Sequence, residues 1–264
     1  MSDVLKTELK DGLLVLTMNR PAQRNALDPT LAQALREATA AAAEDPAVRA
    51  VLLTGAGGHF CVGGDVKAMN VGQGRDLPIG ERIHSLRDRM SASQYLHDMP
   101  KPTIAAIEGS CAGAGLSLAL ACDLRICAEE AKITTAFAKV GLSGDFGGTY
   151  FLTQILGAAK ARELYLTSPL LSGREAAELG LMTRAVAADS LQQEARALAA
   201  ALAAGPTLTL GRIKQNIALA EAGGSLGACF DQEARNHILS STTADHREAA
   251  AAFVGKRKPA FTGS

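Results

Sequence analysis

A short apolar run that ends in a glycine-rich turn constrains the fold of this chain more than any other feature. Residues 104–107 (IAAI) are followed by Glu108-Gly109, and Gly113-Ala114-Gly115 then opens a helical pattern of leucines. This order predicts a buried strand, a tight turn and a helix. Glycine lets the backbone approach a ligand closely, and the first N–H groups of a helix lack acceptors within the helix. We therefore expect backbone donors at this turn that can hold a developing oxyanion.

A second glycine-rich segment lies downstream and carries one carboxylate. Residues 141–149 (GLSGDFGGT) place Asp145 among four glycines, just before a predicted helix. A carboxylate at this place either caps the helix by accepting a backbone hydrogen bond or serves as a catalytic base. The residues alone leave both interpretations open.

The composition indicates a globular chain without a charge bias. Of 264 residues, 47% are hydrophobic and 20% are charged, which suffices to bury a core as one domain with an appendage or as two small domains. Lysine plus arginine and aspartate plus glutamate number 27 each. No field of one sign therefore draws the chain onto nucleic acid or an anionic membrane.

The cysteines and the apolar segments predict an intracellular protein. The five cysteines are odd in number and show no CxxC or Cys/His ligand spacing, which indicates a reduced chain without a metal site. The longest apolar stretch, around Cys111 to Cys122, is too short to span a bilayer, and the first residues are polar and charged. We therefore expect a cytoplasmic protein with no membrane segment and no nucleic-acid partner.

Strands and helices alternate along the first half of the chain, which favours α/β layering. Asp28 and Pro29 begin the first helix as its N-cap and first helical residue. Gly55-x-Gly57 after a strand is compatible with a dinucleotide-binding fold, but Phe60 stands where the third glycine of that motif belongs. The predicted strands span 13–18, 48–54 and 104–107, and the predicted helices span 29–45, 81–96, 191–204, 207–222 and 225–239.

The last third of the chain is predicted to be mostly helical. Ser172 and Glu175 form a capping box that begins one short helix, and Gly180 ends it. Asp245 is expected to cap the last helix, which extends through Phe253. This region should form a helical appendage to the α/β part.

Four motifs, in order, resemble the enoyl-CoA hydratase/isomerase (crotonase) superfamily. They are the segments 58–67 (GHFCVGGDVK), 108–115 (EGSCAGAG), 145–149 (DFGGT) and 252–261 (AFVGKRKPAF). Each motif alone is weak, but the four together cover essentially the whole chain in the family's order and spacing. The resemblance implies an α/β fold of the ClpP/crotonase type. In that fold a spiral of ββα units would occupy residues 1–200, and a helical trimerisation region would occupy residues 201–264.

The same resemblance implies a coenzyme A thioester substrate, with no cofactor beyond the CoA that the substrate carries, and a homotrimer or a dimer of trimers. By the family pattern, the backbone N–H groups of Gly64 and Ala114 flank the thioester oxygen. The adenine lies against residues 65–67, and Phe253 and Lys256 of a neighbouring subunit close over the nucleotide. The residues implied in CoA binding are Ala26, Gly64, Asp65, Val66, Lys67, Ala114, Phe253 and Lys256.

Departures from the family pattern bear on the chemistry. A hydratase of this family uses two glutamates, and the corresponding positions hold Ser117 and Phe137, neither of which exchanges a proton with water at neutral pH. Asp145 stands where that hydratase has glycine. Family members with an acid at this position include dienoyl-CoA isomerases, ring-1,2-epoxyphenylacetyl-CoA isomerases and a haloaryl-CoA dehalogenase. The segments 136–149 and 244–248 look most like the epoxyphenylacetyl-CoA isomerase group.

We therefore expect an acyl-CoA isomerase in which two backbone N–H groups stabilise an enolate and Asp145 is the single proton shuttle. Ser117, Phe137 and Phe146 would line the acyl pocket, where an apolar setting raises the pKa of the aspartate. Three alternatives stay open. They are a hydratase that uses Asp145 alone, an enzyme in which Asp145 attacks an activated ring, and a catalytically silent CoA-thioester binding protein.

Other candidate residues have simpler interpretations. Ser117 is more typical of a small core residue than of a nucleophile, since no Gly-x-Ser-x-Gly motif surrounds it. His84 and His97 follow a helical pattern and are expected at the surface or in packing contacts. Cys61 and Cys111, beside the glycine turns, are expected to act as small hydrophobic residues.

Overall fold

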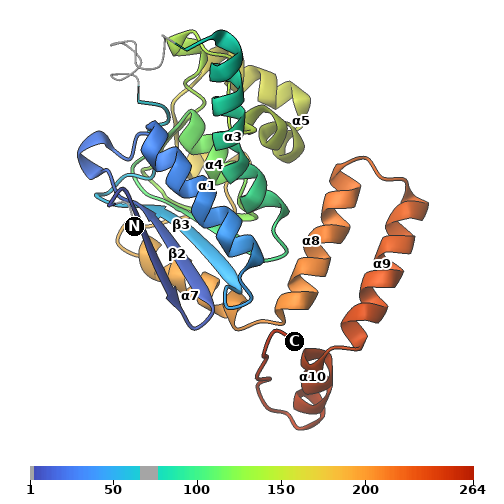
Figure 1. Cartoon of the computed structure of the whole chain (residues 1–264). Helices are drawn as coiled ribbons and strands as arrows, with labels where there is room; N and C mark the ends of the chain where they lie inside the picture. Colours follow the sequence, from blue (N-terminus) through green and yellow to red (C-terminus); the bar gives the residue numbers. More distant parts are fainter. Residues whose placement is uncertain (1–2, 66–76) are drawn as a thin grey trace.

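The computed structural model describes residues 3–65 and 77–264, which form two β-sheets with helices packed around them (Figure 1). The strands in these ranges are β1 (Leu5–Lys10), β2 (Leu13–Met18), β3 (Ala50–Gly55), β4 (Thr103–Ile107), β5 (Ser110–Ala112), β6 (Leu124–Ala128), β7 (Lys132–Thr134), β8 (Leu171–Ser172) and β9 (Arg184–Val186). The larger sheet has the order β1-β2-β3-β4-β6-β9, and all neighbouring strands in it are parallel except β1 and β2. The smaller sheet has the order β5-β7-β8.

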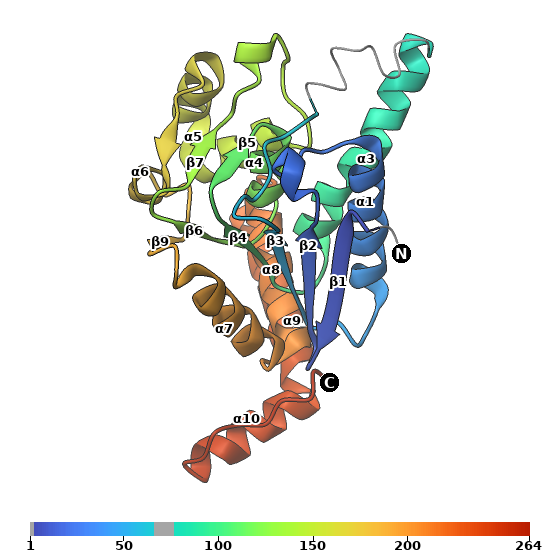
Figure 2. The same ribbon diagram turned by 90° about the vertical axis from the view of Figure 1, so that its left-hand side faces the viewer.

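Helices cover both faces of the larger sheet. They are α1 (Pro29–Glu44), α3 (Ile79–Asp98), α4 (Ala114–Leu120), α5 (Gly148–Thr167), α6 (Gly173–Glu178), α7 (Leu191–Ala203), α8 (Thr207–Glu221), α9 (Leu226–Ser241) and α10 (Ala244–Val254). Helix α1, with α3 packed beside it, lies on one face, and α7 lies on the other (Figure 2). Strands β3 and β4 are therefore buried on both faces, which explains the apolar runs 50–53 and 104–107 within them.

Two consecutive ββα units, β4-β5-α4 and β6-β7-α5, build the part of the fold that carries the candidate site. In each unit the first strand joins the larger sheet and the second strand joins the smaller sheet. The chain therefore changes sheet within each unit. The predicted spiral of ββα units is confirmed, as is the strand, turn and helix predicted from residue 104 onward.

Several predicted helix ends are confirmed. The Asp28 carboxylate accepts a hydrogen bond from the Leu31 N–H (2.8 Å) at the start of α1. Ser172 and Glu175 form the predicted capping box of α6, and Gly180 follows this helix with a φ of +80°. These local signals worked because each depends only on residues within one helical turn.

Two features of the fold differ from the sequence-based expectation. Asp245 does not cap α10; the Thr243 side chain does, and the buried Asp245 carboxylate accepts hydrogen bonds from the N–H groups of Thr262 (2.7 Å) and Gly263 (2.9 Å). Strand β1 was also not expected, because most of its residues are polar and exposed. It pairs with β2 as a charged edge strand, which deters further pairing.

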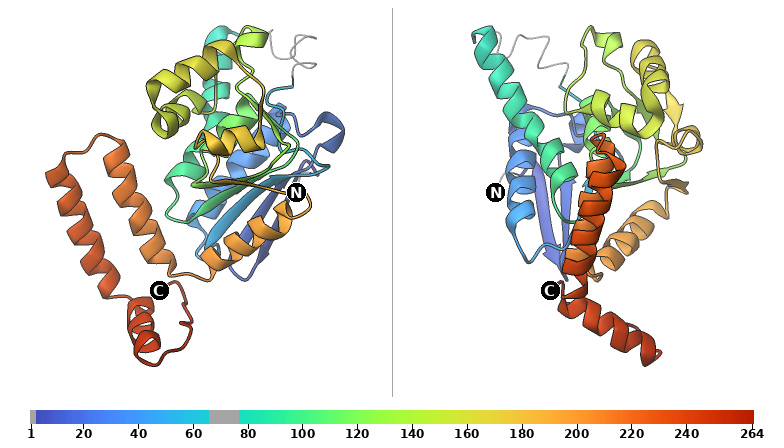
Figure 3. Two further views of the ribbon diagram at one scale, coloured as in Figure 1. Left: turned by 180° about the vertical axis from the view of Figure 1, so that it is seen from behind. Right: turned by 90° about the vertical axis from the view of Figure 1, so that its right-hand side faces the viewer.

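Helices α8 and α9 form a hairpin that extends away from the sheets, and α10 follows it (Figure 1, Figure 3). Helix α7, which ends at Ala203, still packs on the larger sheet. The helices that leave the sheet therefore begin just after the expected boundary between residues 200 and 201. In the single chain, this region exposes the large apolar residues Leu208, Ile213, Ile217, Leu226, Phe230, Ile238, Leu239, Phe253 and Val254. Such a surface fits the expected role in oligomerisation, which stays a prediction.

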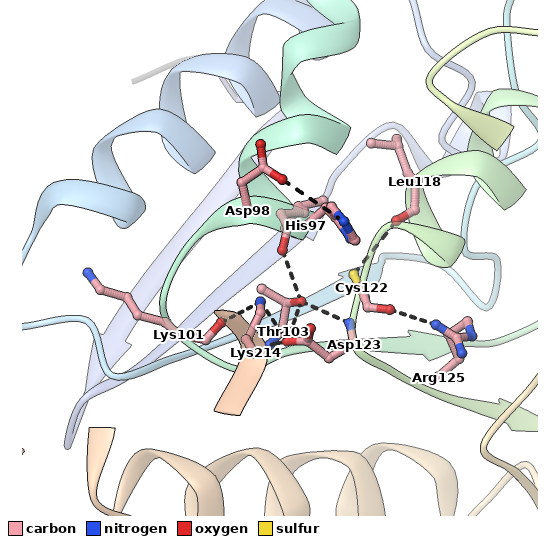
Figure 4. A network of polar contacts seen from close by, with 10 residues as sticks. His97, Asp98, Lys101, Thr103, Leu118, Cys122, Asp123, Arg125 and Lys214 are labelled. Atoms are coloured by element: carbon pink, nitrogen blue, oxygen red, sulfur yellow. Dashed lines mark hydrogen bonds and ion pairs between the residues drawn. The ribbon is translucent and has the colours of Figure 1, made fainter. Parts of the chain in front are cut away.

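A polar network anchors the hairpin to the strand that precedes the glycine turn (Figure 4). The Asp123 carboxylate accepts hydrogen bonds from the Thr103 N–H (2.7 Å) and the Thr103 hydroxyl (3.0 Å). The same carboxylate lies 2.9 Å from the Lys214 ammonium, which also donates to the Lys101 carbonyl oxygen (3.0 Å). Helix α8 is thereby tied to the start of β4 and to the turn after α4.

Asn25 holds the loop between β2 and α1 against the segment that leads into the site. Its side chain is fully buried, Nδ2 donates to the carbonyl oxygens of Ala56 (2.9 Å) and His59 (2.7 Å), and Oδ1 accepts from the Arg20 N–H (2.9 Å). Its φ is +56°, a conformation that asparagine tolerates better than most residues. One side chain therefore fixes two loops.

We expect Asn25→Ala to lower the free energy of unfolding by about 2–4 kcal/mol, because buried carbonyl and N–H groups lose their partners. Urea-induced unfolding followed by circular dichroism measures this change. Arg24→Ala is the matched control, since Arg24 has a similar φ (+48°) but an exposed side chain, and it should change stability little. Equal stability of the Asn25→Ala protein and its parent would contradict the assignment.

Candidate active site

Two glycine turns meet at the start of α4. Gly63 has a φ of +87°, and a Cβ atom on it would lie 2.8 Å from the Ala112 carbonyl oxygen and 3.3 Å from the Ala114 nitrogen. A Cβ atom on Gly115 would lie 2.3 Å from the Cys61 carbonyl oxygen. Only residues without a side chain allow the two backbone segments to approach so closely.

Two N–H groups at this junction, those of Gly64 and Ala114, have no acceptor among the described residues. Leu27 donates to the Gly63 carbonyl oxygen (2.8 Å) and accepts from the Asp65 N–H (3.3 Å). In this parallel pairing the N–H of Gly64 points away from Leu27. Ala114 is the first residue of α4, where an N–H has no acceptor within the helix. Both groups are available to an external acceptor.

Ala26 and Asp65 lie beside Gly64, since the neighbour of Ala26, Leu27, pairs with Gly64 and Asp65 follows it in the chain. The carbonyl oxygen of the buried Ala26 accepts a hydrogen bond from the Arg20 guanidinium, and the same guanidinium lies 3.4 Å from the Asp65 carboxylate. Arg20 therefore holds two of the residues expected to bind CoA in one place. Val66 and Lys67, which were expected to continue this site, lie outside the described residues.

Asp145 lies in the loop that enters α5, and its side chain does not cap that helix. The N-cap is Gly147, with no side-chain hydrogen bond. Oδ1 of Asp145 is buried and has no hydrogen-bond partner in the part of the chain that the structure describes. Burial raises the pKa of Asp145 to about 6, because removal from water disfavours the charged form. The helix-cap interpretation is therefore wrong, and a pKa of about 6 is compatible with the catalytic-base interpretation.

Aromatic side chains surround the Asp145 loop. Phe137 stacks on Tyr165 with a ring-centroid separation of 5.9 Å and an interplanar angle of 2°. Phe146 is buried although its φ is +49°, a strained conformation for a bulky residue. Ser117 lies next to the same loop, since its Oγ would be 2.2 Å from a Cβ atom on Gly148. The three residues expected in the acyl pocket thus border one region.

The Asp145 loop also lies near the junction that carries the two N–H donors. The Asp145 charge contributes to the raised pKa of Cys61, after the larger effect of burial. Ser117, which contacts the loop at Gly148, lies one helical turn after Ala114. The structure therefore brings the buried carboxyl of Asp145 and two backbone donors to one region of the molecule.

Tyr165 was not singled out from the sequence, although it lies in this region. Its hydroxyl oxygen would be 2.4 Å from a Cβ atom on Gly148. Burial raises the pKa of Tyr165 to about 12; the nearby Ser117 side chain acts in the opposite direction and the Asp145 charge in the same direction. A single tyrosine within a helical pattern belongs to no motif, so only the three-dimensional contacts reveal it.

The remaining candidates lie in packing contacts or on the surface. His84 is exposed on α3, and His97 packs against the ring of Phe151 at a centroid distance of 5.2 Å. Cys61 and Cys111 are fully buried, and burial raises the pKa of both thiols, that of Cys61 to about 12. These residues fit the simpler interpretations that the sequence suggested.

Phe253 and Lys256 are not near Gly64 in the single chain. Phe253 is 86% exposed near the end of α10, which lies at the opposite end of the molecule from α4 (Figure 1, Figure 2). Lys256 follows in an exposed turn with a φ of +48°. Their expected contact with a nucleotide held by a neighbouring subunit stays a prediction.

Other features lie away from this region. An open pocket of about 660 Å³ lies between α8 and α9, and Asp145 is not among the residues that line it. Within residues 3–65 and 77–264, no group of three or more His, Cys, Asp or Glu side chains is placed to hold a metal ion. The helices in those two ranges include none that is long and apolar enough to cross a bilayer.

Comparisons with known proteins cover nearly the full length of the chain. Residues 8–264 match the family model described as enoyl-CoA hydratase/isomerase. The 1,2-epoxyphenylacetyl-CoA isomerase of Escherichia coli (strain K12) is 38% identical over 267 residues, 100% of each chain. The human mitochondrial enoyl-CoA hydratase domain-containing protein 2 is 37% identical over 263 residues, 96% of this chain and 86% of that one. The crystal structure of an enoyl-CoA hydratase from Polaromonas sp. JS666 gives a TM-score of 0.90 at 34% identity, covering 97% of this chain and 99% of that one.

The buried carboxyl of Asp145 should contribute less to the stability of the folded chain at neutral pH than at acidic pH. The pKa of an ordinary aspartate is 3.8, and that of Asp145 in the folded chain is about 6. The stabilisation that Asp145 contributes is therefore fully present below about pH 4 and is lost as the pH rises through about 6. Asp145→Asn removes this cost. The variant should exceed its parent by up to about 3 kcal/mol at pH 8, and the difference should vanish toward pH 4.

Thermal unfolding at several pH values measures this difference. Asp189→Asn, which changes an exposed carboxylate, is the control and should show no comparable trend. A difference between Asp145→Asn and its parent that stays constant from pH 4 to pH 8 would mean that Asp145 titrates alike in the folded and unfolded chains.

Proposed function

Because the chain belongs to the enoyl-CoA hydratase/isomerase family, we propose that it isomerises an acyl-CoA thioester with Asp145 as its only acid–base residue. The observation that carries this proposal is the buried Oδ1 of Asp145, which has no hydrogen-bond partner among the described residues and lies in the same region as two backbone donors without an acceptor in that part of the chain. The two positions at which a hydratase of the family would hold glutamates contain Ser117 and Phe137. One carboxyl group near two donors suits proton transfer next to a carbonyl.

The N–H groups of Gly64 and Ala114 would bind the thioester oxygen. Hydrogen bonds from preorganised donors strengthen as negative charge develops on that oxygen, which lowers the barrier to enolate formation. Neither donor has another acceptor among the described residues, so substrate binding breaks no hydrogen bond within the protein. The tight packing at Gly63 and Gly115 keeps the two donors in place.

Asp145 would then move one proton between two carbons of the acyl group. The carboxylate accepts a proton from the α carbon, or through conjugation from the γ carbon, and the electron pair of the broken C–H bond delocalises onto the thioester oxygen. The resulting carboxylic acid returns the proton to the other carbon, and the enolate collapses to the isomeric thioester. No water is consumed and no net proton is released. A base with a pKa of about 6 can serve in both directions near neutral pH.

Hydration is the second candidate, because a related human protein and a structural relative carry hydratase in their names. Water addition requires one group that activates water and another that protonates carbon. Ser117 is almost fully buried and Phe137 has no ionisable group, so neither supplies the second function. This arrangement supports isomerisation over hydration.

The family also implies how the CoA moiety is held. Ala26 and Asp65, fixed next to the donors by Arg20, would contact the nucleotide portion. Phe253 and Lys256 would reach the nucleotide of a neighbouring subunit in a trimer or a dimer of trimers, and their exposure in the single chain supports this role. Coenzyme A enters only as part of the substrate.

Asp145→Asn should lower isomerisation and solvent deuterium uptake by a factor of about 1,000 or more, because the amide keeps the shape but cannot accept the proton. Thioester binding, measured by calorimetry, should persist. Ser117→Ala is the matched control and should have a mild effect. Mass spectrometry of a panel of acyl-CoAs incubated in D2O measures both exchange and water addition.

Each alternative gives a different result in the same panel. A hydratase would add the mass of water to crotonyl-CoA, and attack of Asp145 on a ring would require a haloaryl-CoA substrate that loses halide. A silent binding protein would bind thioesters without turnover. Exchange at the parental rate in a folded Asp145→Asn protein would refute Asp145 as the proton shuttle.

Replacing Ala114 by proline should cost about a hundredfold or more in turnover, because it deletes one oxyanion donor. Proline is favoured at the first position of a helix, and this N–H has no acceptor among the described residues, so the fold should tolerate the change. Ala114→Gly keeps the N–H group and serves as control. A near-normal rate in a folded Ala114→Pro protein would show that this N–H does not bind the thioester.

A further inference from the structure

Tyr165 lies against the loop that carries Asp145 at two points, one before and one after Asp145 in the sequence. A Cβ atom on Gly144 would be 3.2 Å from ring atom Cε1 of Tyr165, and a Cβ atom on Gly148 would be 2.4 Å from its hydroxyl oxygen. These glycines lie one residue before and three residues after Asp145. The loop therefore rests on the phenol more closely than a side chain at Gly148 would permit.

Contacts on its other sides hold Tyr165 in place. Its ring stacks on Phe137, nearly parallel, at a centroid distance of 5.9 Å. Ser117 Oγ would be 2.2 Å from the same Cβ position on Gly148, so both hydroxyl groups meet the loop at one point. Ser117 belongs to the helix that begins with Ala114, and Tyr165 belongs to the helix that follows Asp145. The tyrosine thus lies where the donor-bearing helix and the base-bearing loop meet.

We infer that the Tyr165 hydroxyl positions Asp145 relative to the oxyanion donors, a role that rests on the proposed function of Asp145. Oδ1 of Asp145 has no hydrogen-bond partner among the described residues, so no polar side chain holds that oxygen in its orientation. The direction of the carboxyl depends instead on the backbone of its loop. Small displacements of a catalytic group, of about 1 Å, cost large factors in rate.

The chemistry of Tyr165 fits a positioning role and not proton transfer. Burial raises the pKa of its hydroxyl to about 12, so the group stays neutral at physiological pH. A neutral hydroxyl adds no charge beside the carboxylate of Asp145. A rigid ring with only two side-chain torsions also costs little conformational entropy to hold in place.

Tyr165→Phe tests the role of the hydroxyl while keeping the ring and its stack on Phe137. We expect kcat for isomerisation to fall about tenfold with little change in KM, because a shifted loop misaligns Asp145 for proton transfer while the Gly64 and Ala114 N–H groups still bind the thioester. The acid limb of the pH–kcat profile should also move to lower pH, since a relaxed loop gives Asp145 more contact with water. Tyr150→Phe, which changes an exposed tyrosine at the start of α5 before the kink at Gly157, is the matched control and should change neither value.

A double-mutant cycle separates positioning of Asp145 from a general structural effect. If Tyr165 acts through Asp145, Tyr165→Phe should cause no further loss of deuterium exchange in an Asp145→Asn background. An equal loss in both backgrounds would overturn the inference, as would a Tyr165→Phe protein with parental kcat and pH profile. Parental exchange by Asp145→Asn would instead refute the proposed function, so the two failures are distinguishable.

Discussion

The close contact between the segment at Cys61–Gly64 and the first turn of α4 is the constraint on which the rest of the structure depends. Side chains at Gly63 or Gly115 would force the two segments apart, so their absence sets the spacing of the N–H groups of Gly64 and Ala114. Parallel strands on either side then fix where the two segments end. A site made from backbone atoms needs this kind of support, because no change of rotamer can correct a misplaced donor.

The chemistry of the site has a cost in stability, and the surrounding packing offsets it. Asp145 is kept partly out of water, which raises its pKa and disfavours its charged form. Phe146, its neighbour, adopts a left-handed conformation that a bulky side chain avoids elsewhere. Both penalties fall within one loop, and the aromatic pair of Phe137 and Tyr165 packs beside it. A buried carboxyl beside a strained residue departs from the rules that favour stability, and such departures are typical of functional sites.

Local patterns predicted the buried strand at 104–107, the glycine turns and the capping box, because each depends on neighbours in the sequence. They also identified Asp145 as a candidate base, but not whether it caps a helix. The edge strand β1, the tail contacts of Asp245 and the position of Tyr165 depend on partners far along the chain. Such contacts form only in the tertiary fold, so the local pattern of a single sequence does not predict them.

The short strands of the smaller sheet affect the order in which parts of the molecule unfold on heating. Its strands β5, β7 and β8 are only two or three residues long, yet β5 leads directly into α4 and β7 into the Asp145 loop. Few backbone hydrogen bonds hold such short strands, so this sheet can open at lower cost than the larger one. Gentle heating would then separate Asp145 from the N–H groups of Gly64 and Ala114 while most helices and long strands persist. Under the proposed function, inactivation would precede melting, and activity would be among the last properties to return on refolding.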